Sequence, residues 1–144
     1  MSTAAFTGNP RGPKLRVCFY RDAKGREPVD EFIDSLPPNH QASIDSQLAI
    51  LGASREKDPP PEHPRSSQIE GELRELRCRH GSAHYRILYR RSGNFLILLH
   101  VFIKTTRAVS EQDKRIARDR WEDFISRMSA DPRIPPRAIG HDAI

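Results

Sequence analysis

Three strand-like segments follow one another with almost no chain between them, at residues 72–79, 83–91 and 94–104. The links between them are the short sequence HGS at residues 80–82 and a turn around Gly93, and short glycine-containing links are typical of β-hairpins. Strands joined this tightly must run antiparallel, because a parallel crossover needs a dozen or more residues. The three segments therefore predict an antiparallel meander at the centre of the fold.

The other predicted elements come before and after this meander. Residues 15–20 are strand-like, and apolar residues recur at helical spacing over residues 28–36 and again over 39–55. Residues 57–65 contain four prolines, so they cannot form a helix or a central strand and are predicted to be a stiff connector. A final helix is predicted over residues 110–128, where a serine is positioned to cap a helix that carries one continuous apolar stripe.

The element order β-α-α-β-β-β-α predicts an α+β fold. In it a helical hairpin and a C-terminal helix pack on a mainly antiparallel four-stranded sheet. The segment 94–104 is apolar on both faces, which indicates a central strand that is covered on both sides over part of its length. A chain of 144 residues suits one domain. We expect a disordered leader at 1–13, the domain at 14–128 and a flexible tail at 129–144.

Positive charge is concentrated in the meander. Residues 72–107 hold eight arginines and lysines against two glutamates, a net charge of +6 where the whole chain has +5. Side chains alternate between the two faces of a strand, so Arg77 and Arg79 share a face. A sheet face with many guanidinium groups suits a polyanion such as RNA, because fixed cations replace the counterions that phosphates condense. The alternative is a solvated basic face that serves solubility.

RNA cleavage by an internal 2′-hydroxyl is the chemistry that these residues suit best. The reaction needs cations to stabilise a dianionic phosphorane and groups that move protons. Arg77, Arg86 and Lys104 are candidates for the cations if their strands pack together, and His100 is a candidate for proton transfer. Structural alternatives stay open: His100 as a hydrogen-bonded core residue, Lys104 as a strand-end charge, and Arg86 as the ion-pair partner of Glu75. Three other histidines are weaker candidates: His63, His80 and His84.

Several classes of protein are disfavoured. The nucleotide-cofactor, P-loop, zinc-protease and α/β-hydrolase motifs are missing from the sequence. No cluster of ligand-type residues has metal-site spacing, so we expect no metal and no cofactor. Two buried free thiols are favoured for Cys18 and Cys78, although a bridge between them stays open. The longest apolar run, 95–103, is too short to cross a bilayer, so we expect a cytoplasmic protein with no membrane partner.

Five short motifs, taken in order, resemble those of one known family. They are PVDEFIDSLP at 28–37, GELRELR at 71–77, YRILY at 85–89, LLHVFIKTT at 98–106 and EQDKRIA at 111–117. Together they resemble the RelE/HigB-like toxin superfamily, and within it the phage-derived HigB-like branch. The resemblance spans about residues 15–127 and implies a RelE-like fold.

The resemblance also implies a function. Such toxins are ribosome-dependent mRNA endonucleases of type II toxin–antitoxin modules, act without a metal, and are inhibited by an antitoxin that often carries a helix-turn-helix domain. The expected partners are therefore this antitoxin, the ribosome and mRNA, with operator DNA reached only through the antitoxin. The family pattern makes Arg77 and Arg86 phosphate-binding residues, Lys104 the first lysine of a Lys-Lys-Thr motif and His100 its upstream histidine. Further RNA-binding residues are predicted on the same strands: Arg74, Arg79, Arg90 and Arg107.

One position departs from the family pattern. Thr105 stands where the motif has its second lysine, which removes a cation from the expected site. No tyrosine near the C-terminus offers a general base of the kind that some RelE relatives have. A non-catalytic function therefore stays open, namely a module that occupies RNA or the ribosome without cutting. A third possibility is an interaction protein whose basic face binds an acidic partner.

Overall fold

The computed structural model describes residues 10–105 and 107–144, which form one six-stranded sheet and three helices. In chain order the elements are β1 (Arg16–Tyr20), α2 (Pro28–Asp34), α3 (Pro38–Gly52), β2 (Ser66–Glu70), β3 (Leu73–His80), β4 (Ala83–Ser92), β5 (Phe95–Ile103), α4 (Glu111–Met128) and β6 (Ile139–Asp142). Across the sheet the strand order is β2-β3-β4-β5-β1-β6. The predicted α+β class is confirmed, and no helix in the described part of the chain is long and apolar enough to cross a membrane.

The antiparallel meander is confirmed. β3 pairs with β4 and β4 with β5, both antiparallel, and Gly81 and Gly93 occupy the two tight links. Their backbone φ angles are +58° and +60°, a left-handed conformation that glycine adopts without steric cost. Turn chemistry visible in the sequence thus sets the register that brings residues of neighbouring strands side by side.

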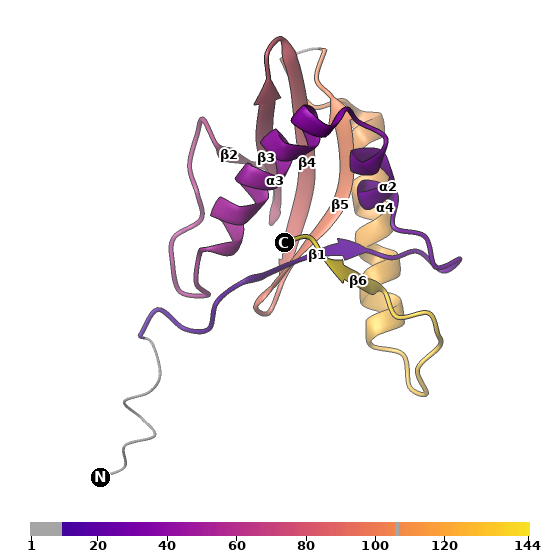
Figure 1. Ribbon diagram of the computed structural model, residues 1–144. Helices are drawn as coiled ribbons and strands as arrows, with labels where there is room; N and C mark the ends of the chain where they lie inside the picture. The colour runs from indigo at the N-terminus through magenta and orange to yellow at the C-terminus, as the bar shows by residue number, and fades with distance from the viewer. Residues whose placement is uncertain (1–9, 106) are drawn as a thin grey trace.

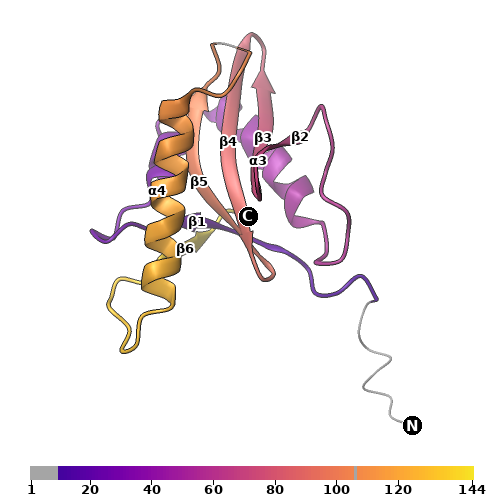
Figure 2. The same ribbon diagram turned by 180° about the vertical axis from the view of Figure 1, so that it is seen from behind.

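Helices cover both faces of the sheet, with α2 and α3 on one face and α4 on the other (Figures 1 and 2). The α3 face buries a core that includes Ile44 and Ile87, and the α4 face buries a second core that includes Leu88 and Phe124. β5 contributes apolar residues to both cores, which confirms its predicted central position.

Two strands, β2 and β6, were not expected, so the prediction of a four-stranded sheet is wrong. β2 pairs antiparallel with β3 directly after the proline-rich connector. Its sequence, SSQIE, lacks the apolar alternation by which strands are recognised. β1 pairs with β5 in parallel, a long-range pairing on which local periodicity carries no information.

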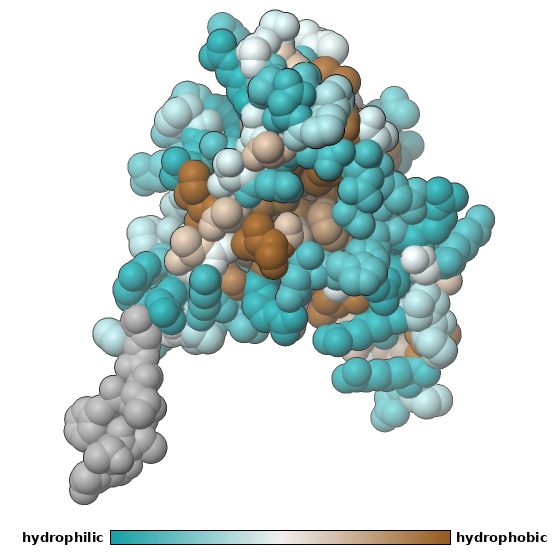
Figure 3. All heavy atoms as spheres, viewed as in Figure 1, coloured by the Kyte–Doolittle hydropathy of each residue, from teal (hydrophilic) through white to brown (hydrophobic). Residues whose placement is uncertain are grey.

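The predicted flexible tail at 129–144 is also partly wrong, because residues 139–142 form β6. This strand pairs antiparallel with β1, and Ala138 and Ile139 are buried beneath the α4 face. The last residue, Ile144, contacts Gly52 of α3, and the chain end seen in Figure 1 coincides with an apolar patch in Figure 3. β1 would otherwise present an unpaired edge, which β6 covers.

Of the predicted leader, residues 1–9 lie outside the described residues, and residues 10–13 are bonded to the folded domain. Arg11 forms an ion pair with Asp58, and the Arg11 carbonyl accepts a hydrogen bond from the Lys57 amide. The two cysteines, Cys18 and Cys78, are buried free thiols in separate cores, as favoured from the sequence.

Burial of β6 leads to a stability prediction for Ile139. Ile139 is 7% exposed, so Ile139→Ala should lower the free energy of unfolding by about 2 kcal/mol, the lower end of the range for a buried isoleucine. Ile134 is 63% exposed and serves as the matched control, with an expected change within about 0.5 kcal/mol for Ile134→Ala. Urea unfolding followed by circular dichroism measures both. Equal effects would mean that β6 is not packed as described.

A buried carboxylate makes the docking of β6 dependent on pH. Burial alone would raise the pKa of Glu27, but hydrogen bonds from the His141 amide, at 2.9 Å, and from Arg21 outweigh it and hold that pKa below its ordinary value of 4.5. The stabilisation is therefore present above pH 4.5 and is lost as the pH falls through the lowered pKa. Asp142 on the same strand, its pKa lowered by hydrogen bonds from Cys18 and Arg16, acts in the same direction.

We expect the exchange protection factor of the Ala143 amide, which bonds to the Val17 carbonyl, to fall as the pH drops from 6 to 3. Glu27→Gln should reduce this pH dependence, and the remainder should disappear when Asp142→Asn is added. Protection that does not change with pH in the unaltered protein would contradict the prediction. Hydrogen exchange measured by NMR resolves this single amide.

Candidate functional site

Three cationic side chains line one open pocket, one each from β3, from β4 and from the residue that follows β5. Arg77 of β3 lies directly opposite Arg86 of β4, and the Lys104 amide, just beyond β5, donates to the His84 carbonyl of β4 at 2.7 Å. Directly opposed residues share a face of the sheet. The pocket has a volume of about 440 Å³, and its lining is strongly basic: Arg77, His84, Arg86, Lys104, Thr105 and Arg107. We call it the cationic pocket.

The pocket is open because α4 covers only part of its face of the sheet. In Figure 2 the helix runs alongside β5, and β3 and the adjoining part of β4 have no helix over them on this side. Arg86 pairs with Phe102 of β5, so it lies on the same face as the core beneath α4. The cationic pocket thus lies on the same face of the sheet as the apolar core beneath α4, next to the edge of that core.

A buried carboxylate holds the two arginines. Glu75 is 1% exposed, and its Oε1 accepts a hydrogen bond from Arg77 Nε at 2.8 Å and one from Ser67 Oγ at 3.2 Å. The same oxygen lies 3.6 Å from Arg86 Nε, which confirms the ion pair that the sequence suggested. Glu75 Oε2 has no hydrogen-bond partner among the described residues. Glu75 therefore fixes the two guanidinium groups from below, while both still line the pocket.

The cations are partly removed from water. Burial lowers the pKa of Arg86 and of Lys104; for Lys104, Glu75 opposes this shift, and Arg86 and Arg77 reinforce it. Cations that repel one another and are partly buried are stabilised electrostatically when an anion binds between them. A lowered pKa also makes an ammonium group a better proton donor. The pocket is therefore suited to a phosphate group and to proton transfer beside it.

His100, predicted to transfer protons, does not line this pocket. Its Nε2 is 2.7 Å from Asp113 Oδ1 of α4, its ring stacks on Phe102, and its side chain is 13% exposed. Burial lowers the pKa of His100, and the hydrogen bond to Asp113 opposes this. The geometry is that of a hydrogen-bonded core histidine, and a catalytic role for His100 stays a prediction.

The four arginines predicted as further RNA-binding residues are dispersed. Arg107 lines the cationic pocket. Arg79 donates to the Gly81 carbonyl and lines an adjoining pocket. Arg90 lies over the Trp121 ring, 4.5 Å from its centroid, and pairs with Glu72. Their contribution to RNA binding stays a prediction, but only the first two lie where the cationic pocket and its neighbour are.

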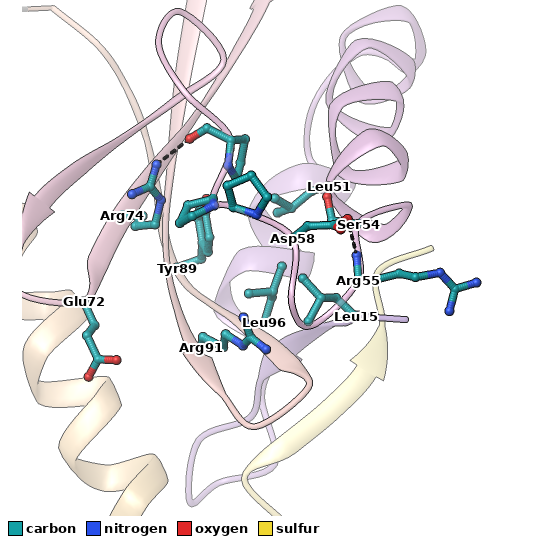
Figure 4. Close-up of a pocket in the computed structure, with 13 residues that line it drawn as sticks. Leu15, Leu51, Ser54, Arg55, Asp58, Glu72, Arg74, Tyr89, Arg91 and Leu96 are labelled. Atoms are coloured by element: carbon teal, nitrogen blue, oxygen red, sulfur yellow. Dashed lines mark hydrogen bonds between the residues drawn. The ribbon is translucent and has the colours of Figure 1, made fainter. Parts of the chain in front are cut away.

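Arg74 is on the opposite face of the sheet. It donates to the Pro61 carbonyl at 2.5 Å and lines a small apolar pocket under the proline-rich connector (Figure 4). That pocket has a volume of about 70 Å³, whereas ligand sites typically measure about 300–1,000 Å³. It is too small for a nucleotide.

Two residues of the site were undervalued or missed from the sequence. The sequence makes His84 a weaker candidate than His100, yet His84 lines the cationic pocket. The signal was available, because His84 and Arg86 are two apart on one strand and so share a face. Glu75 and Arg77 are likewise two residues apart on one strand and share a face. Thr106, at the end of the motif that contains Lys104, lies outside the described residues.

Comparison with protein families identifies one match. The family described as "Phage derived protein Gp49-like (DUF891)" matches residues 31–122. This range is 92 of the 144 residues and contains the meander together with Arg77, Arg86 and Lys104. No curated protein matches the chain.

Proposed function

The chain belongs to the Gp49-like family of phage-derived proteins, a RelE-like toxin family associated with toxin–antitoxin systems, and on this basis we propose that it is a ribosome-dependent mRNA endonuclease. Within the RelE/HigB-like superfamily we propose that it belongs to the phage-derived HigB-like branch. Its partners are the ribosome, mRNA and an inhibitory antitoxin with a helix-turn-helix domain, through which operator DNA is reached.

One observation carries the enzymatic part of the proposal. Arg77, Arg86 and Lys104 come from three different segments and line one open pocket. Preorganised cations aimed at a place where negative charge develops are the largest single contribution in many enzymes. The three cations would stabilise the dianionic phosphorane more strongly than the bound phosphodiester, which carries a single negative charge.

The residues of the pocket support the following sequence of steps. His84 accepts the proton of the 2′-hydroxyl, and the 2′-oxygen forms a bond to phosphorus. Arg77 and Arg86 stabilise the dianionic phosphorane. The bond from phosphorus to the 5′-oxygen then breaks, and Lys104 gives that oxygen a proton. The products are a 2′,3′-cyclic phosphate and a 5′-hydroxyl end, and no further reactant is needed.

The proposal is tested with purified ribosomes that hold a defined mRNA. Adding the protein should cut the mRNA at the A-site codon and leave ends with a 2′,3′-cyclic phosphate and a 5′-hydroxyl. Ribosome-free mRNA is the control and should be cut far more slowly. Intact mRNA on the ribosome, or ends of another chemistry, would overturn the proposal.

A second candidate function is a translation inhibitor that binds RNA or the ribosome without cutting. The observation in its favour is Thr105, which lines the pocket where the family motif has a lysine and so leaves it one cation poorer. Mapping mRNA 5′ ends in cells after induction separates the two functions. New ends within codons support cleavage, and arrested synthesis on intact transcripts supports blocking.

A further inference from the structure

We propose that a second pocket next to the cationic one binds the nucleotide on one side of the reacting phosphate, with the proline-rich connector as its wall. We call it the connector pocket. This inference rests on the proposed function and deepens it, because it names the residues that contact a base of a single-stranded RNA. Both pockets are lined by Arg77, His84 and Arg86, so they adjoin at these three residues.

The connector pocket has the right size for a nucleotide. Its volume is about 580 Å³, within the usual range of about 300–1,000 Å³ for ligand sites. Besides the three shared residues, it is lined by residues 62–65 of the connector, by Gln47 of α3, and by Cys78 and Arg79 of β3. With the reacting phosphate at the shared arginines, one flanking nucleotide lies toward Lys104 and the other toward the connector.

The connector is held by the same arginine that lines both pockets. The Arg77 amide donates to the Arg65 carbonyl at 2.9 Å, and Arg77 Nη1 donates to the Pro64 carbonyl at 3.5 Å. Nearer the start of the connector, Arg74, whose side chain lies on the other face of the sheet, donates a hydrogen bond to the Pro61 carbonyl. Prolines also restrict the backbone of this segment. A wall that is ordered before binding loses little conformational entropy when a ligand arrives.

The exposed side chains of the wall are of the types that recognise single-stranded RNA. His63 offers a flat ring on which a base can stack, and Arg65 and Arg79 offer guanidinium groups for stacking or for a second phosphate. Glu62 offers only acceptor oxygens when ionised, so it favours a base with an amino group over uracil. The pocket therefore selects the base as well as binding the strand.

A titration followed by NMR tests this in the full chain. The probe is a 2′-O-methyl RNA trinucleotide, which cannot be cut because its attacking hydroxyl is blocked. Amide shifts of wild-type protein should change around residues 62–65 as well as around residues 84–86. Shifts confined to residues 84–86 would overturn the connector pocket and leave the proposed function standing. No shift at millimolar probe would overturn the connector pocket, while the ribosome assay above decides the proposed function independently.

Three variants sharpen the test. His63→Ala should weaken binding of the probe about tenfold, as expected for the loss of one stacked base. Lys57 lies in the same connector but does not line the pocket. Lys57→Ala should therefore change the affinity for the probe less than twofold. Glu62→Gln should reduce the preference for cytosine over uracil at one probe position. Equal binding by wild type and His63→Ala, or equal loss in His63→Ala and Lys57→Ala, would contradict the proposal.

Discussion

Replacing Arg86 by alanine should slow mRNA cleavage on the ribosome about 100- to 1,000-fold, the usual effect of removing one preorganised stabilising group. Arg86 is the more buried of the two arginines that pair with Glu75. Its side chain is 12% exposed, whereas that of Arg77 is 25% exposed. Charge–charge interactions strengthen as water is excluded. The loss should therefore fall on the chemical step, and single-turnover kinetics with saturating protein should measure it.

Arg91→Ala is the matched control for Arg86→Ala. Arg91 lies on the same strand and carries the same charge, but it lies near the other end of β4, where it lines the small apolar pocket. Its replacement should change the rate less than threefold. Arg86→Lys keeps the charge, loses the planar fork, and should recover part of the rate. Rates that are equal in Arg86→Ala and Arg91→Ala would remove Arg86 from the site.

Replacing Glu75 by glutamine should lower the free energy of unfolding by about 3 kcal/mol, because breaking a buried ion pair leaves an uncompensated charge. Glu75 has a side chain that is 2% exposed, and it is the counterion of both Arg77 and Arg86. Without its charge the two guanidinium groups repel each other at the sheet surface. Urea unfolding should show a shifted midpoint and an unchanged slope.

Glu72→Gln is the matched control for this stability prediction. Glu72 also pairs with an arginine, but its side chain is 76% exposed, and exposed pairs contribute about 0–1 kcal/mol. Combining Glu75→Gln with Arg86→Ala should cost less than the two single effects added together, since the second change removes the charge that the first leaves unpaired. A fully additive result would mean that the two side chains are not coupled.

Much of the architecture followed from local patterns. The meander was predicted from three strand-like segments and two glycine links, and α4 from an apolar stripe and Ser110, whose side chain accepts the hydrogen bond from the Asp113 amide that caps the helix. Such signals are local because turn conformation, capping and side-chain periodicity involve residues close in the chain. They did not reveal β2, β6 or the parallel pairing of β1. Those strands depend on partners 70 or more residues away or, for β2, on an edge position that tolerates polar residues.

The site shows the same division. Alternation along the strands placed Arg77 and Arg86 as candidates, and pairing register brought them opposite each other. Alternation could not say where α4 would end its cover over the sheet. That boundary decides that His84 lies in the cationic pocket and that His100 lies beneath the helix against Asp113.

The amino-acid sequence by itself determined the three helices, β1 and the three strands of the meander, together with its turns and the charge excess on its strands, because each of these depends on neighbours along the chain. Only the tertiary structure decided which face of the sheet stays open, which histidine meets the arginines, and that the C-terminal residues complete the sheet. These outcomes depend on which distant surfaces bury one another, and that competition is settled only when the whole chain packs.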